Sequence, residues 1–157
     1  VTLEADGAPS NGFQQVAFDA GDLDIGEVPP FTIQRVEGNG LTFLNTTGDL
    51  NIGVLNIANQ NGTGLLVDTS GLNTNFNLDI GGGTIDTIGG AGIIANNGAG
   101  TLGLNLNNSA VNSTGNTIDL TNSTVSGLGN TALGFACING GGNTGQVSFN
   151  GGADTCP

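Results

Sequence analysis

Apolar residues alternate with polar ones in short runs, and the runs are separated by stretches rich in Gly, Asn and Thr. Clear examples are Leu50-x-Ile52, Phe76-x-Leu78-x-Ile80 and Leu102-x-Leu104-x-Leu106. Alternation places every second side chain on one face of a strand, so each run predicts a short β-strand with one buried face. No long stretch keeps the 3.6-residue spacing of a helix, and Gly, Asn and Thr are poor helix formers. The pattern therefore predicts an all-β fold.

One unit of this pattern recurs along the chain. It first appears as IQRVEGNGL from Ile33 to Leu41, and it returns at Ile57–Leu65, at Ile85–Ile93 and, shortened by one residue, at Val111–Ile118. The copies begin 24, 28 and 26 residues apart, a period that is typical of repeat architectures. Three short strands fit in each period. We therefore predict a single-stranded parallel β-helix, a three-sided β-solenoid of about five to six rungs, with Gly and Asn at its corners.

The two ends depart from the repeat. Residues 1–30 contain six of the 13 acids and end at Pro29-Pro30, so they predict an N-terminal cap or an irregular first rung. Residues 31–136 form the solenoid rungs in this interpretation, and residues 137–157 form a Gly-rich C-terminal cap. The register is ambiguous after Leu120, because Val125 fits either a short third side of one rung or the start of the next.

The same alternation sorts side chains into core and surface. Most of the Phe residues occupy apolar positions, and the core is expected to include Phe18, Phe31, Phe43, Phe76, Phe135 and Phe149. The polar residues between the apolar ones are expected to face water, as at Thr42, Asn77, Asp79 and Asn105.

The chain has two cysteines, Cys137 and Cys156. We interpret them as a disulfide that ties down the C-terminal cap, with two free thiols as the alternative. A disulfide indicates an oxidising, extracytoplasmic compartment, and the expected location is extracellular or at the cell surface.

The formal charge of −12 excludes several partners. It comes from 13 acids and one base, Arg35, with no Lys, whereas nucleic acids and anionic membranes attract basic surfaces. The sequence has no run of 18 apolar residues, so membrane insertion by this chain is not expected. The chain begins at Val1 and contains no Met, which suggests a processed chain or a fragment of a larger surface protein.

The Gly/Asn/Thr-rich rungs of residues 31–120 resemble the right-handed β-helices of bacterial autotransporter passengers and related surface adhesins. The most similar phrase is GNTIDLTNSTVSG, from Gly115 to Gly127. The resemblance is one of sequence style, and it implies a secreted or surface-displayed stalk or binding module.

The residue types restrict catalysis. The chain has no His, which removes His-based triads and His general acid–base catalysis. Carboxylates remain, and Asp68, Asp86 and Asp119 lie at or near outward strand positions. Asp86 and Asp119, in the phrases Ile-Asp-Thr and Ile-Asp-Leu, are the candidates for a carboxylate pair along one outer face, as in a glycan-active β-helix hydrolase or lyase. The alternative is that they are solvated charges, and we expect the protein not to be an enzyme.

Two further classes are weighed. Asp19, Asp22, Asp24 and Glu27 are a candidate calcium site or, alternatively, part of an acidic cap, and no other cofactor is expected. An ice-binding solenoid needs regular Thr rows, whereas Thr84/Thr87 and Thr117/Thr121 do not recur in a fixed column.

The sequence thus predicts a non-catalytic extracellular module that contacts a cell-surface protein or a glycan. Contact is expected through an outer sheet face or through loops where the rung length varies. The candidate loops are Asn73-Thr74-Asn75 and Asn96-Asn97-Gly98.

Overall fold

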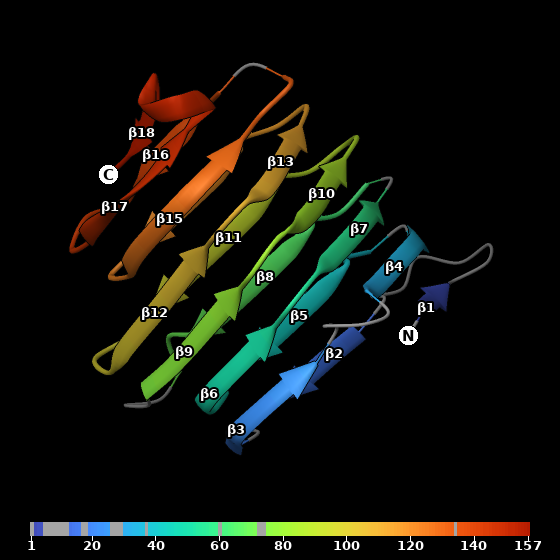
Figure 1. Cartoon of the computed structure of the whole chain (residues 1–157). Coiled ribbons are helices and arrows are strands. Elements are labelled where there is room, and N and C mark those ends of the chain that lie inside the picture. Colours follow the sequence, from blue (N-terminus) through green and yellow to red (C-terminus); the bar gives the residue numbers. More distant parts are fainter. Residues whose placement is uncertain are drawn as a thin grey trace.

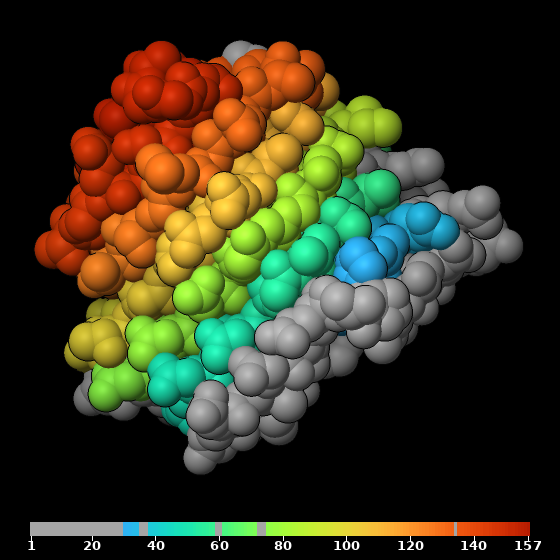
Figure 2. All heavy atoms as spheres, viewed as in Figure 1, coloured from blue at the N-terminus to red at the C-terminus, as the bar shows by residue number. Residues whose placement is uncertain are grey.

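The computed structural model describes residues 2–4, 13–16, 19–25, 30–36, 38–59, 61–71, 75–133 and 135–157. Within these ranges the chain is an all-β parallel solenoid of about four turns without an α-helix. Figure 1 shows the strands of successive coils side by side, with the N- and C-terminal coils at opposite ends of the stack. In the space-filling view of Figure 2 the coils appear as parallel bands ordered by sequence. The predicted fold class is confirmed.

Each coil contributes one strand to each of three faces. The first face consists of β1 (Thr2–Glu4), β4 (Phe31–Val36), β7 (Leu55–Asn59), β10 (Gly83–Thr87) and β13 (Ser109–Ser113). The second consists of β2 (Phe13–Val16), β5 (Leu41–Leu44), β8 (Leu65–Thr69), β11 (Ile93–Asn97), β14 (Ile118–Thr121) and β16 (Cys137–Asn139). The third consists of β3 (Asp19–Ile25), β6 (Thr47–Ile52), β9 (Asn75–Ile80), β12 (Thr101–Leu106), β15 (Thr124–Asn130) and β17 (Thr144–Phe149).

The prediction of five to six rungs was too high, because it counted both ends as full rungs. The solenoid has about four turns, which are the coils that begin at β4, β7, β10 and β13. Before them, β1 to β3 belong to a stretch that is described only in part. After them, β15 serves two faces, and β18 (Asp154–Cys156) runs antiparallel to β17. The C-terminal segment therefore closes the stack with a reversed strand.

The ambiguous register at Val125 is resolved by the length of β15. Val125 pairs with Leu104 on the third face, and Gly129 of the same strand pairs with Ser109 on the first face. The first half of β15 is thus the third side of one coil, and its second half begins the next. Val125 is therefore on the third side of its coil, and the next coil begins only at the end of the same strand.

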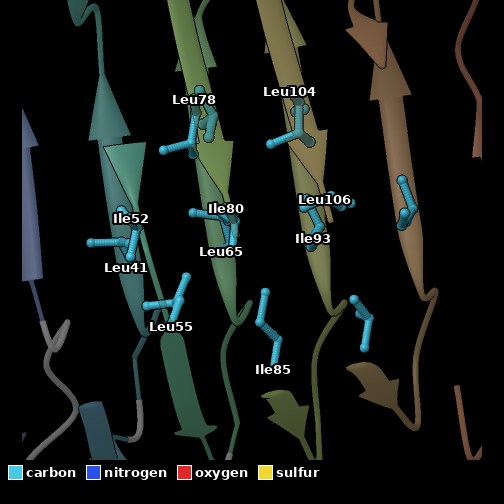
Figure 3. Close-up of a cluster of buried hydrophobic side chains, with 14 of the residues drawn as sticks. Leu41, Ile52, Leu55, Leu65, Leu78, Ile80, Ile85, Ile93, Leu104 and Leu106 are labelled. Carbon is cyan, nitrogen blue, oxygen red and sulfur yellow. The ribbon is translucent and has the colours of Figure 1, made fainter. Parts of the chain in front are cut away.

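The recurring unit places its apolar ends in register. Ile33, Ile57, Ile85 and Val111 pair in sequence along the first face, and the residues that end each unit pair along the second face. All of them are buried. Figure 3 shows inward-pointing side chains stacked from coil to coil, among them Leu78 beside Leu104. Stacking of identical positions fills the interior with aliphatic side chains and explains why the period is kept.

The second glycine of the unit is required by close packing between coils. A Cβ at Gly40 would lie 2.6 Å from the carbonyl oxygen of Gly64, and one at Gly64 would lie 2.7 Å from that of Gly92. A Cβ at Gly92 would lie 2.7 Å from the carbonyl oxygen of Thr117, which ends this column in the shortened fourth copy. A side chain at any of these three corners would push neighbouring coils apart.

Polar corners and the predicted core are arranged largely as expected. Among the described residues, four Asn have positive φ at turns, namely Asn45, Asn108, Asn122 and Asn150. Phe31, Phe43, Phe76 and Phe149 are buried, and Phe135 packs partly buried against the core, whereas Phe18 lies outside the described residues. Thr42 differs from the prediction, since it stands in the outward column beside Leu66 but is buried, and its hydroxyl has no hydrogen-bond partner.

The predicted disulfide between Cys137 and Cys156 is present, with the two Cα atoms 5.9 Å apart. It joins β16 to β18, the last strand, after the 3₁₀ turn η1 (Asn150–Gly152). The bond therefore fastens the reversed strand to the second face. In the described part of the chain, no helix has the length and hydropathy needed to cross a membrane.

Candidate binding site

The outer face of β6, β9, β12 and β15 carries two columns of polar side chains. The register pairs Asp49 with Asn77, Asn77 with Gly103, and Gly103 with Thr124 in the first column. The second column stands two residues further along each strand and contains Asn51, Asp79, Asn105 and Ser126. Because side chains alternate between faces, both columns point away from the apolar core.

These two columns line a shallow groove with a volume of about 420 Å³. We call it the Asp–Asn groove and define it by Asp49, Asn51, Asn77, Asp79, Gly103, Asn105, Thr124 and Ser126. It runs across four coils of the solenoid. Its polar groups are carboxylates, amides and hydroxyls, and no basic or aromatic side chain lines it.

Hydrogen bonds between coils hold the side chains of the groove. The Nδ2 of Asn77 donates to Oδ1 of Asp49 at 2.6 Å, and the Nδ2 of Asn105 donates to Oδ2 of Asp79 at 3.2 Å. Each bond joins one carboxylate to the amide of the next coil. The groups are therefore ordered before any ligand arrives, which reduces the entropic cost of binding.

Gly103 makes room for a neighbouring amide in the first column. It lies between Asn77 and Thr124, where every neighbour in the column has a side chain. A Cβ built on Gly103 would run into the Oδ1 of Asn77. The lack of a side chain at this position therefore leaves room for the amide of Asn77, which lies across it.

The groove continues at its edge into further ordered polar groups. The Oδ1 of Asn75 accepts hydrogen bonds from the backbone N–H of Thr101 at 3.1 Å and from its Oγ1 at 3.0 Å. Thr124 and Thr144 share a hydroxyl hydrogen bond of 2.9 Å. Ordered polar groups thus continue along the strands at Asn75 and Thr101, and one coil further toward the C-terminus at Thr144.

The structure does not bring the predicted carboxylates together. Asp86 lies on β10 of the first face and Asp119 on β14 of the second, so the expectation that they line up along one outer face is wrong. Their similar local phrases misled the prediction, because the phrases occur at different sides of the coil. Asp68 is on the second face with Asp119, but it pairs with Leu44 and Asn96 in another column.

The candidate calcium residues fall in or near β3. Asp22 and Asp24 pair through the backbone with Asp49 and Asn51, and Asp19 pairs with Thr47. The side chains of these residues and the whole of Glu27 lie outside the described part of the structure. In the part that is described, no group of three or more acidic or Cys side chains is arranged to hold a metal ion.

Of the two predicted contact loops, one lies partly outside the described residues, and the other has a buried residue at its centre. Asn73 and Thr74 lie outside the described residues, and Asn75 begins β9. Asn97 is only 3% exposed, so it points into the solenoid and is not a surface contact. Asn96 is half-buried on β11, and a Cβ at Gly98 would meet the carbonyl oxygen of Ser70 at 2.7 Å. The Asn-Asn-Gly sequence here makes an internal corner.

The threonines that were weighed for ice binding are Thr84, Thr87, Thr117 and Thr121. In the described columns that contain them, threonine does not repeat from coil to coil to form a continuous row. Thr84 pairs with Asn56 and Ala110, and both Thr87 and Thr117 are buried. This agrees with the sequence, in which these threonines do not recur in a fixed column.

Sequence reasoning predicted that Asn77, Asp79 and Asn105 face water, but it did not assemble them into a groove. The signal was present in three aligned phrases, Asp49-Leu-Asn-Ile, Asn77-Leu-Asp-Ile and Gly103-Leu-Asn-Leu. Aligning them by their apolar positions gives both polar columns and shows the missing side chain at Gly103.

Comparisons of the chain with protein-family models, with curated proteins and with solved structures find no match.

Proposed function

We propose that this chain is a non-catalytic extracellular module, a stalk or adhesive β-solenoid that binds a ligand on another cell or on a surface. The Asp–Asn groove carries this proposal. It is an ordered polar surface on a rigid scaffold, and its lining groups suit hydrogen bonding more than burial of an apolar ligand. An extended face made of repeated coils is the surface that solenoid proteins commonly use for binding.

The disulfide supports the extracellular location. Cys137 and Cys156 are bonded, and structural disulfides persist in oxidising compartments. The acidic charge of −12 is compatible with a displayed, well-solvated module and disfavours nucleic acid. The resemblance to autotransporter passengers and surface adhesins agrees with this assignment and suggests that the chain functions as part of a larger surface protein.

A cell-binding measurement tests the proposal. The chain has no Lys, so an amine-reactive fluorophore attaches only to the N-terminal amino group and leaves the groove unmodified. The labelled protein should bind saturably to a panel of cells or to immobilised cell-surface glycans and proteins, and an excess of unlabelled protein should compete. A complete lack of saturable binding across the panel would overturn the proposal.

A glycan-active enzyme is the second candidate, and one observation favours it. Asp49 and Asp79 line the same groove on neighbouring strands, two residues apart in register. Glycosidases use a pair of carboxyl groups that flank the scissile bond, and diagonal neighbours on one face of a sheet are close enough to act as such a pair. This pair replaces Asp86 and Asp119 as the candidate carboxylates.

Release of reducing ends from neutral polysaccharides measures this activity directly. Enzyme function predicts turnover that Asp49→Asn and Asp79→Asn each abolish, while Asp86→Asn leaves it unchanged. Binding without turnover in the unmodified protein would exclude the second candidate and leave the first.

A further inference from the structure

We infer that the Asp–Asn groove binds one sugar ring of an uncharged, hydroxyl-rich glycan, seated against the side chains of its two polar columns. The inference rests on the proposed binding function and specifies the ligand class and the point of contact. Three features of the groove carry it, namely its shape, its hydrogen-bonding groups and its charge.

The shape comes from Gly103. Its backbone forms the floor between Asn77 and Thr124 in the first column, and Asp79 and Asn105 stand beside it in the second. The φ angle of Gly103 is not in the left-handed region, so backbone conformation does not require glycine here. Glycine is instead required by the outer face, where the Oδ1 of Asn77 occupies the place that a Cβ would take.

The hydrogen-bonding groups match hydroxyl pairs. The bond from Asn77 uses Oδ1 of Asp49, and the bond from Asn105 uses Oδ2 of Asp79. The second oxygen of each carboxylate is thus a strong acceptor for a ligand hydroxyl, and each amide also has an oxygen that accepts. A sugar ring presents neighbouring hydroxyls that both donate and accept, so it can satisfy such a mixed surface.

The charge excludes anionic glycans. Asp49 and Asp79 are the ionisable groups that line the groove, and the chain has a single base, Arg35, which is not among its residues. Sulfated sugars, sialic acids and uronates would bring negative charge against these carboxylates without a cation to offset it. A neutral sugar forms the same hydrogen bonds without this repulsion.

The groove has no aromatic platform, and this sets the affinity. Stacking on Trp or Tyr would add apolar contact area, but the apolar residues that line the groove are Leu78 and Leu104, which are only 1% and 2% exposed. We expect a Kd of about 1 mM for a single ring. Useful binding then requires many copies of the module or a polymeric ligand, where avidity multiplies weak contacts.

The test measures binding of the intact chain, immobilised through its N-terminal amine, to dextran, mannan and xylan by surface plasmon resonance. Heparin and oligolysine serve as the anionic and cationic probes. At least one neutral polysaccharide should bind with little dependence on salt, and heparin should not bind. Salt-sensitive binding of oligolysine alone would overturn the inference and point to a basic protein partner.

Two pairs of variants locate the site. Gly103→Ala displaces the amide of Asn77 and should weaken neutral-glycan binding about tenfold or more, whereas Ala58→Ser on the exposed first face should not change it. Asp79→Asn should weaken binding by a similar factor, while Asp86→Asn should not. Asp86 is a matched control because its carboxylate also accepts a bond from the next coil, at 2.7 Å from Asn112.

Failure of this inference is distinguishable from failure of the proposed function. If Gly103→Ala binds neutral glycans as well as the unmodified protein does, the groove is not the site. If none of the three neutral polysaccharides binds, the ligand class is wrong. In both cases saturable binding of the labelled chain to cells would still uphold the adhesive function, and thermal unfolding confirms that each variant is folded.

Discussion

Thr69 and Asn97 are hydrogen-bonded inside the solenoid, although 28 residues separate them in the sequence. The Oγ1 of Thr69 donates to Oδ1 of Asn97 at 2.8 Å, and both side chains are buried. The Nδ2 of Asn97 donates to the carbonyl oxygens of Gly100 at 2.7 Å and of Asn122 at 3.2 Å. One amide therefore connects three successive coils at an internal corner.

Replacing this amide should destabilise the protein. Asn97→Ala leaves the hydroxyl of Thr69 and the two carbonyl groups without their partner, and we expect a loss of about 2–3 kcal/mol in the free energy of unfolding. Denaturant titration followed by circular dichroism measures it. Asn96→Ala, at the adjacent half-buried position on β11, should change stability by less than about 0.5 kcal/mol. Equal effects of the two variants would contradict the proposed role of the corner.

Thr46 provides the opposite case. It is fully buried, and its hydroxyl has no hydrogen-bond partner. An unpaired buried hydroxyl costs free energy, so the isosteric change Thr46→Val should stabilise the protein by about 1 kcal/mol. The matched control is Thr69→Val, which removes a hydroxyl that is bonded to Asn97 and should destabilise by about 1 kcal/mol.

The sign of the difference between these two threonine variants is the decisive result. Both lose the same oxygen and gain the same methyl group in a buried position, so changes in hydrophobic transfer largely cancel. Destabilisation by Thr46→Val would show that its hydroxyl has a partner in solution.

The glycine columns predict a strong effect of a single methyl group. A Cβ at Gly64 would lie 2.7 Å from the carbonyl oxygen of Gly92 and 2.9 Å from the Cγ2 of Thr87. The backbone oxygen cannot move without separating two coils, so Gly64→Ala should destabilise by about 1–3 kcal/mol.

Gly103→Ala is the control for this substitution. The new Cβ there meets only the end of the Asn77 side chain, which can rotate away. Replacing a strand glycine by Ala also reduces the entropy of the unfolded chain, so stability should stay the same or rise by up to about 1 kcal/mol. If Gly103→Ala lowers the free energy of unfolding as much as Gly64→Ala does, the close contact with a backbone oxygen is not what makes Gly64 necessary.

The architecture could be predicted from the sequence because it depends on a repeated local rule. Ile33, Ile57 and Ile85 recur with the coil, and each pairs with the next in the structure. The rung count could not be predicted as well, because the ends do not follow the rule. A strand such as β15, which serves two faces, has the same alternation as one that serves a single face.

The candidate site depended on register across coils, which local phrases do not give. Ile85-Asp86 and Ile118-Asp119 look alike, but one lies on the first face and the other on the second. Asp49 and Asn77 look unlike, and yet they are neighbours. The side of the coil on which a residue lies depends on the summed lengths of the preceding corners, and those vary from coil to coil.

The disulfide gives the last prediction. Cys137 and Cys156 are 19 residues apart, and their bond fastens β18 to β16. Closing a loop of this length stabilises the fold by about 3 kcal/mol in the chain-entropy model, so the free energy of unfolding of the double variant Cys137→Ser, Cys156→Ser should be lower by about that much.

Reduction of the unmodified protein should add two hydrogens to its mass. Amide exchange should accelerate mainly in β16 to β18, while the central coils at β8 and β11, which are remote from the bond, retain their relative protection. Uniform acceleration across all coils would instead show that the C-terminal closure holds the entire stack together and that the solenoid unfolds as one cooperative unit from this end.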